Sequence, residues 1–257
     1  MFPGIAEIKV KGHIIGGVKP SVCVPLVALN REGLLAEAAT VAEIQPDIVE
    51  WRADYFSDVE NFASVSSALS SIRGILAGYP LIFTCRVQSE GGCREISRDV
   101  RVALLKEVIR TGQVDIVDIE LETGREIISE IVDEAHRNKS YVIVSNHDFN
   151  KTPPKEEIVA RMIRAQDYGA DMVKIAVMPK SPQDVLTLLE ATLQFRHDHA
   201  RVPVVSMAMS GQGVVSRIAG FLYGSTITFA AGKEASAPGQ ISIAKLRTAI
   251  DTLFDAL

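Results

Sequence analysis

The sequence is poor in cysteine and aromatic residues, and it has no long apolar run and no run of basic residues. Three cysteines in 257 residues are too few for a disulfide scaffold, so we expect reduced thiols. No apolar stretch reaches the ~18 residues that a membrane span requires. Acidic residues (32) outnumber basic ones (27) and the formal net charge is −5, so we expect no nucleic-acid and no membrane partner.

The opening segment MFPGIAEIKVKG lacks a basic region followed by an apolar one. We therefore expect no signal peptide and a cytoplasmic protein. Hydrophobic residues make up 47% of the chain and charged residues 23%, which is typical of globular proteins. Because no linker, repeat or low-complexity stretch interrupts the chain, the sequence predicts a single domain over residues 1–257.

Short apolar runs alternate with longer amphipathic segments along most of the chain. Runs rich in Val and Ile that bury both faces are typical of parallel strands. The eight runs are 22–29, 47–52, 80–86, 114–121, 141–147, 171–178, 203–209 and 225–230. The amphipathic segments that follow them are 31–44, 61–76, 100–110, 125–137, 154–169, 181–196, 213–224 and 241–257.

Eight strand–helix pairs in a chain of this length predict an α/β protein, a (β/α)8 TIM barrel. A doubly wound open sheet is disfavoured because no Gly-rich fingerprint follows the first run. Ser181-Pro182 is a helix N-cap signal, and Gly169 and Gly224 stand where helices should end. The alternating segment 7–17, with a turn at Gly16-Gly17, predicts an N-terminal hairpin within residues 1–20 that closes the bottom of the barrel.

Polar residues gather at the carboxyl ends of the predicted strands, where barrel enzymes carry their active sites. Lys174 is the most informative of these residues, because it lies in the middle of an otherwise apolar run. It shares its strand face with Met172 and Ala176, which points it into the barrel. Burial disfavours the ammonium, and a neutral amine forms a Schiff base with a carbonyl. The alternative is a structural lysine paired with an inward carboxylate such as Glu120.

His147 ends the fifth predicted strand, next to the strand that carries Lys174. An imidazole and an amine on neighbouring strands can reach one small molecule, and histidine is the usual proton carrier near neutral pH. The alternative is a structural histidine that caps the strand end.

The charges at this rim favour an anionic substrate over a metal ion. Its carboxylates and His147 are possible ligands, but Arg52, Arg86 and Lys174 bring three positive charges to the same place. We therefore expect no metal. The SGQG turn after the seventh strand precedes Arg217, a candidate ligand for a carboxylate or phosphate. The loops 88–95 and 230–240 are candidate lids.

Taken together, these segments resemble the type I 3-dehydroquinate dehydratases of the shikimate pathway, which serves aromatic amino acid biosynthesis. The resemblance spans nearly the whole chain. The matching segments are EWRADYF (50–56), FTCR (83–86) with Glu90-Gly91-Gly92, DIELE (118–122), SNHDF (145–149), DMVKIAVMP (171–179), SMAMSGQGVVSR (206–217) and SAPGQ (236–240). In place of a serine that some members carry near the end of the first strand, this chain has Pro25.

The resemblance implies a role for each matching residue. It assigns Lys174 as the Schiff-base lysine, His147 as the general acid/base and Glu90 as the acid that orients His147. Arg217 would bind the substrate carboxylate. The other implied substrate ligands are Glu50, Arg52, Arg86, Met207, Ser236 and Gln240.

The implied reaction is the dehydration of 3-dehydroquinate to 3-dehydroshikimate, a hydro-lyase reaction that needs no cofactor, in a homodimer. Two alternatives remain from the residues themselves. One is a class I aldolase, which also uses a barrel lysine and acts on sugar phosphates. The other is a non-catalytic barrel that binds a small anion.

Overall fold

The computed structural model describes residues 4–5, 7–232 and 236–257. Within these ranges the chain forms an eight-stranded parallel sheet and a separate antiparallel hairpin. The order of the sheet is β10-β3-β4-β5-β6-β7-β8-β9. Its strands are β3 (Ser21–Leu26), β4 (Ile48–Arg52), β5 (Leu81–Thr84), β6 (Ile116–Glu120), β7 (Tyr141–Asp148), β8 (Met172–Val177), β9 (Val204–Ala208) and β10 (Ile227–Phe229). Each lies within or overlaps one predicted run, so the predicted strands are confirmed.

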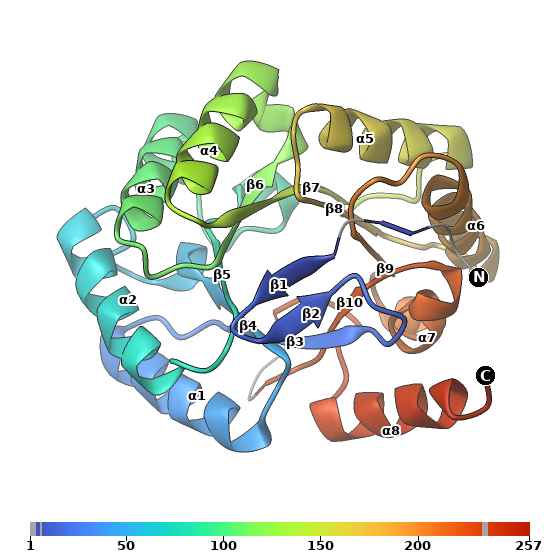
Figure 1. The fold of residues 1–257 in the computed structure, drawn as a ribbon, viewed down its shortest axis with the longest axis horizontal. Helices are drawn as coiled ribbons and strands as arrows, with labels where there is room; N and C mark the ends of the chain where they lie inside the picture. Colours follow the sequence, from blue (N-terminus) through green and yellow to red (C-terminus); the bar gives the residue numbers. More distant parts are fainter. Residues whose placement is uncertain (1–3, 6, 233–235) are drawn as a thin grey trace.

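The two edge strands come together and nearly close the barrel. A parallel bridge joins Val204 to Ser225, and the amide of Thr226 donates to the carbonyl of Val204 at 2.8 Å. The helices form a ring outside the strands (Figure 1). They are α1 (Arg31–Ile44), α2 (Phe62–Ile75), α3 (Arg98–Arg110), α4 (Arg125–Arg137), α5 (Lys155–Asp167), α6 (Pro182–Asp198), α7 (Val214–Ala219) and α8 (Ile243–Phe254). The barrel fold is as predicted.

The helix boundaries follow from local chemistry. At α6, Ser181 and Asp184 form a capping box with Pro182 at the first helical position, as the sequence predicts. Gly169 (φ +98°) follows the end of α5, and Gly224 (φ +106°) ends the short turn after α7. A non-glycine residue is strained at such positive φ values.

The N-terminal hairpin pairs β1 (Ile8–Val10) with β2 (His13–Ile15). Its turn lies at Lys11-Gly12, not at Gly16-Gly17 as predicted, because this two-residue turn has positive φ at both central residues (51° and 79°). Ile8, Val10 and Ile15 pack against the residues inside the barrel. Figure 1 shows the hairpin in front of the middle of the barrel.

Side chains divide into two apolar layers around the sheet. Ile48, Ile82, Ile116 and Met172 at the strand beginnings fill the barrel together with the hairpin, which therefore closes the amino-terminal end. The alternate residues of the same strands pack against the helices. Since the amino-terminal end is filled by apolar side chains, the polar side chains of the interior lie at the carboxyl ends of the strands.

Candidate active site

Lys174 lies inside the barrel on β8, and 6% of its surface is exposed. The strand alternation that predicts this orientation is confirmed, since Met172 and Ala176 belong to the interior cluster. Lys174 is paired with inward carboxylates, as the alternative of a structural lysine also predicts, but among the described residues not with Glu120, the example named for it. Lys174 Nζ lies 3.0 Å from Asp118 Oδ2 and 3.5 Å from Glu50 Oε1, and it makes no ion pair with Glu120 in the described part of the chain. It also lies 4.6 Å from the centre of the Phe229 ring.

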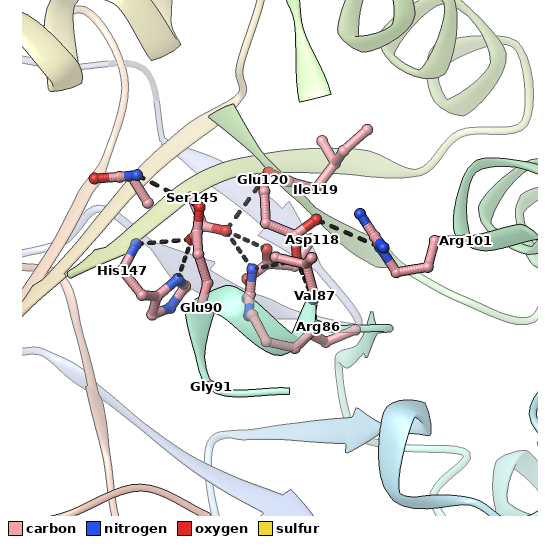
Figure 2. Close-up of polar contacts among 12 residues, drawn as sticks. Arg86, Val87, Glu90, Gly91, Arg101, Asp118, Ile119, Glu120, Ser145 and His147 are labelled. Atoms are coloured by element: carbon pink, nitrogen blue, oxygen red, sulfur yellow. Dashed lines mark hydrogen bonds and ion pairs between the residues drawn. The ribbon is translucent and has the colours of Figure 1, made fainter. Parts of the chain in front are cut away.

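Arg86 binds both inward carboxylates of β6, Asp118 and Glu120. Its Nη1 lies 2.9 Å from Glu120 Oε1, and its Nη2 lies 2.8 Å from Asp118 Oδ2 (Figure 2). Ser145 Oγ also donates to Asp118, at 2.5 Å. Burial alone would raise the pKa of Asp118, but Arg86 and Lys174 outweigh it and hold this pKa well below its usual range. Asp118 therefore stays ionised beside Lys174.

His147 and Glu90 form a hydrogen-bonded pair at the end of β7. One oxygen of Glu90 accepts from the backbone amide of His147 at 2.8 Å and lies 3.0 Å from His147 Nδ1. Burial raises the pKa of Glu90 to about 7, against the opposing effect of Arg86. Burial, together with Arg86 and Lys174, lowers the pKa of His147 well below its usual value. Because Nδ1 faces Glu90, Nε2 is the nitrogen left for proton transfer.

The segment that carries Glu90 is tied down by Asp54. The carboxylate of Asp54 is fully buried and accepts from the Arg52 guanidinium at 2.8 and 2.9 Å. It also accepts from the backbone amides of Arg86 at 3.2 Å and Cys93 at 2.9 Å. Arg52 in turn donates to the carbonyl of Gly91 at 3.0 Å. The candidate lid 88–95 is therefore anchored here on both sides of Glu90.

Arg217, on α7, is a buried cation with no carboxylate within ion-pair distance among the described residues. Its Nη2 donates to the carbonyl of Pro238 at 3.1 Å, and its Nη1 lies 3.6 Å from Met207 Sδ. Its Nε has no hydrogen-bond partner among the residues that the structure describes, and burial lowers the pKa of Arg217 to about 10. An uncompensated buried guanidinium is prepared to receive an anion.

The segment 236–240 of the second candidate lid lies over this region, whereas residues 233–235 lie outside the described residues. Gln240 Nε2 donates to Ser236 Oγ at 3.0 Å, and the amide of Ser236 donates to Gln240 Oε1 at 2.8 Å. In the SGQG turn, a Cβ at Gly213 would come within 2.1 Å of the carbonyl of Ala208. Close packing therefore explains this glycine, and Arg217 remains the candidate anion ligand after the seventh strand.

One cavity brings nearly all the predicted site residues together. Those that line it are Glu50, Arg52, Arg86, Glu90, His147, Lys174, Met207, Ser236 and Gln240. Arg217 stands just behind this lining and reaches it through Met207. The cavity therefore offers an amine, an imidazole and a set of hydrogen-bonding groups to a single small molecule.

Four carboxylates in and around the cavity are paired with cations. Asp54, Asp118 and Glu120 each face an arginine, and Glu50 faces Lys174. In the part of the chain that the structure describes, no group of three His, Cys, Asp or Glu side chains has a metal-binding arrangement.

No described helix is long and apolar enough to cross a membrane. Cys23, Cys85 and Cys93 are free thiols, and the first two are buried.

Comparison with known proteins places this chain in a family. The model of the type I 3-dehydroquinases matches residues 22–256. The chain belongs to the type I 3-dehydroquinase family. It is 46% identical to the 3-dehydroquinate dehydratase of Clostridioides difficile, over 98% of each chain. It is 49% identical to that of Klebsiella pneumoniae (strain ATCC 700721 / MGH 78578), over 90% of this chain and 92% of the relative.

Solved structures of type I 3-dehydroquinases share the whole fold. The Clostridium difficile type I 3-dehydroquinate dehydratase, solved with covalently modified comenic acid, has a TM-score of 0.95 and 45% identity, with 98% of this chain and 99% of that chain covered. The 3-dehydroquinate dehydratase from Geobacillus kaustophilus has a TM-score of 0.96 and 40% identity, with 99% of each chain covered. The family resemblance seen in the sequence is thus confirmed.

Several groups of this type I 3-dehydroquinase site were not singled out from sequence. They are Asp54, Ser145 and the aromatic rings of Phe149 and Phe229, the last two of which line the cavity. Asp54 lies in the matched segment EWRADYF, so its charge next to Arg52 was the available signal. Pro25 lies in β3 and pairs in register with Glu50. It offers no hydroxyl at this position.

Proposed function

We propose that this chain catalyses the dehydration of 3-dehydroquinate to 3-dehydroshikimate through a Schiff base on Lys174. Membership of the type I 3-dehydroquinase family supports the reaction. The cavity supports the mechanism, because a buried lysine and a histidine stand on neighbouring strands, with Ser145 opposite Lys174 and His147 opposite Ala176. In this reaction the amine supplies the covalent intermediate and the imidazole moves the protons.

The chemical steps follow from these two groups. The Lys174 ammonium releases one proton to solvent, and the neutral amine adds to the substrate ketone. The oxygen of the adduct takes up a proton and leaves as water, so that an iminium remains. The iminium withdraws electrons and acidifies the neighbouring C–H bond, and His147 takes that proton. The resulting enamine expels the β-hydroxyl, which leaves as water with the proton from His147. Water then hydrolyses the iminium, which releases the product and frees Lys174.

The ion pairs around Lys174 set the conditions for the first step. In the free site the ammonium is compensated by Asp118 and Glu50. The amine becomes a nucleophile only after it loses a proton. Asp118 stays anionic because Arg86 and Lys174 lower its pKa, so it stabilises the positive iminium nitrogen that forms later at the same place.

The remaining residues of the cavity are assigned to substrate binding. Glu50, Arg52 and Arg86 would contact the ring hydroxyls, with Met207 beneath the ring. Ser236 and Gln240 would close over the substrate, exchanging their mutual hydrogen bonds for substrate contacts. Glu90 holds His147 through Nδ1 and the backbone amide, which keeps Nε2 available as the base.

The environment of Arg217 is the main support for a substrate that bears a carboxylate. It is 2% exposed, faces no carboxylate among the described residues and has one unpartnered N–H. A substrate carboxylate would supply the missing charge and accept two hydrogen bonds from the guanidinium. A sugar-phosphate aldolase would instead rely on more backbone amides, and family membership also favours the dehydratase.

Borohydride trapping tests the proposal directly. The protein is incubated with 3-dehydroquinate, reduced with borohydride and mapped by peptide mass spectrometry. We expect one adduct, on the peptide that contains Lys174, and none when 3-dehydroquinate is omitted. A folded protein that gives no adduct and no turnover would overturn the proposal, and an adduct with sugar phosphates alone would indicate the aldolase.

The wider organisation of the protein is proposed on the family resemblance and the composition. We expect a cytoplasmic homodimer whose residues 1–257 form a single domain. Light scattering coupled to gel filtration measures the mass of the particle, and calorimetry shows whether it unfolds in one cooperative transition.

A further inference from the structure

Asn146 is a polar residue on the outward face of the barrel. On β7 it lies between Ser145 and His147, and it pairs in register with Ile175, whose side chain packs in the outer apolar layer. Asn146 is 7% exposed. A buried amide in such a layer is costly unless its donors and acceptor are both used. The structure shows that they are, and that they link two separate parts of the molecule.

Arg161 of α5 engages the amide from the helix side. Its Nη1 donates to Asn146 Oδ1 at 2.8 Å, and its Nη2 pairs with Glu157 one turn earlier. Asp148 Oδ2 lies 3.8 Å from the same Nη1. A guanidinium only donates, so it fixes the amide with its oxygen toward Arg161. The NH2 group of Asn146 must then point the opposite way.

On the opposite side, the NH2 group meets Glu90. Asn146 Nδ2 lies 3.5 Å from Glu90 Oε1. The other oxygen, Glu90 Oε2, contacts the backbone amide and Nδ1 of His147. Residues of β7 therefore contact both oxygens of the Glu90 carboxylate. If the amide were reversed, its oxygen would face the carboxylate oxygen and repel it. The orientation that Arg161 imposes is therefore the one that holds Glu90.

We propose that Arg161 and Asn146 are positioning residues that hold Glu90, and through it His147, in the arrangement needed for proton transfer. This inference rests on the proposed dehydratase function. Neither residue lines the active-site cavity, so neither is expected to touch the substrate. The chain from Arg161 through Asn146 to Glu90 connects helix α5 to the catalytic histidine.

The charged groups around the pair determine what the loss of Arg161 should do. Arg86 favours an ionised Glu90, whereas burial, Glu120 and Asp118 favour the protonated form. Arg86, Lys174 and Arg52 disfavour a charged His147, and Asp118 favours it. A hydrogen-bond donor held next to Glu90 favours the ionised form of the carboxylate. Without that donor, Glu90 should take up a proton at a higher pH.

The test is Arg161→Met in the full-length protein, with kcat and KM measured across pH. We expect kcat to fall about ten-fold, because the histidine is less well oriented. KM should stay within two-fold (roughly, since the substrate ligands are untouched). The acidic limb of kcat should move to higher pH. Arg161→Lys, which keeps one donor, should recover part of the loss.

Two variants on the same helix are matched controls. Arg164→Met removes a guanidinium that pairs with Glu122 at 2.8 Å, away from the site. Glu157→Gln removes the charge of another partner of Arg161 and leaves Asn146 in place. Both should keep the wild-type kcat and pH profile. If either control loses as much kcat as Arg161→Met at an unchanged thermal midpoint, the effect belongs to the helix and the inference is wrong.

A double-mutant cycle separates a connected chain from two independent effects. Asn146→Ala should lower kcat about as much as Arg161→Met, and the double variant should lose no more than either single variant. Additive losses would overturn the inference. Borohydride trapping distinguishes failure of the proposed function from failure of the positioning role alone. If the wild type forms no Lys174 adduct, the proposed function fails. If it does and Arg161→Met has wild-type kcat and pH dependence, only the positioning role fails.

Discussion

Lys174 Nζ lies 3.0 Å from Asp118 Oδ2, and Asp118 in turn receives Arg86 at 2.8 Å. The buried amine thus shares one carboxylate with a guanidinium that never loses its charge. As long as Arg86 keeps Asp118 ionised, a cationic iminium on Lys174 finds the same counter-ion as the ammonium it replaces. The covalent step therefore creates no new uncompensated charge in the barrel.

Lys174→Ala should abolish both turnover and the borohydride-trapped adduct, since no other described lysine lines the cavity. Mass spectrometry after reduction and a spectroscopic assay of turnover measure the two losses. Lys180→Ala is the matched control, because Lys180 is an exposed lysine in the segment after the same strand. Near-normal turnover in Lys174→Ala would show that the Schiff-base mechanism is wrong.

His147→Ala should still form the imine but turn it over 10²- to 10⁴-fold more slowly, roughly the contribution of a general acid/base. Lys174 and Arg217 keep their surroundings in this variant, so binding and imine formation do not depend on the imidazole. Reduction of a single-turnover mixture should trap the Lys174 adduct in high yield. His197→Ala, at an exposed position, should behave as the wild type. Failure to trap the adduct in folded His147→Ala would contradict this division of roles.

The barrel and the direction of Lys174 were predictable because both depend on local patterns. Each strand is an apolar run that buries both faces, and Lys174 follows the alternation of Met172 and Ala176. The partner of Lys174 was not predictable in the same way. Asp118 and Glu120 lie two residues apart on one strand, and Arg86 pairs with both of them, so only the packed side chains show that Lys174 meets Asp118.

The anchoring of the Glu90 segment depends on contacts that no local pattern encodes. Asp54 accepts from the amides of Arg86 and Cys93, which lie 32 and 39 residues further along the chain. The orientation of Asn146 depends likewise on Arg161, a residue of the following helix. A sequence shows that these polar groups exist, but only the packed chain shows which of them meet.

Glu90→Gln should change the pH dependence of stability. Burial raises the pKa of Glu90 from 4.5 to about 7, so the folded protein holds a proton on this carboxyl in a range where the unfolded chain does not. The stability that Glu90 contributes is complete below pH 4.5 and is lost as the pH rises through about 7. Glutamine cannot ionise and lacks this loss, which amounts to about 3 kcal/mol at most.

The thermal midpoint of Glu90→Gln relative to the wild type should therefore rise from about pH 4.5 through about pH 7 and level off by about pH 8. Differential scanning fluorimetry in buffers of equal ionic strength measures the difference. Glu130→Gln, at an exposed position on α4, should show a difference that does not change with pH in this range. A midpoint difference for Glu90→Gln that is flat or falls with pH would mean that Glu90 is ionised throughout.

Arg217→Met should weaken substrate binding without weakening the fold. The guanidinium is buried without a carboxylate partner in the described chain, so the free protein bears the cost of its desolvation. Methionine fills a similar volume and removes that cost, so the thermal midpoint should stay the same or rise. Loss of a charged hydrogen bond of about 1.5–3 kcal/mol should raise KM for 3-dehydroquinate by about 10- to 150-fold.

Steady-state kinetics measures the change in KM and calorimetry measures the change in thermal midpoint. Both are carried out on Arg217→Met and on the exposed control Arg201→Met. An unchanged KM in Arg217→Met would show that the substrate carboxylate binds elsewhere, and a large drop in the midpoint would show that Arg217 is chiefly structural.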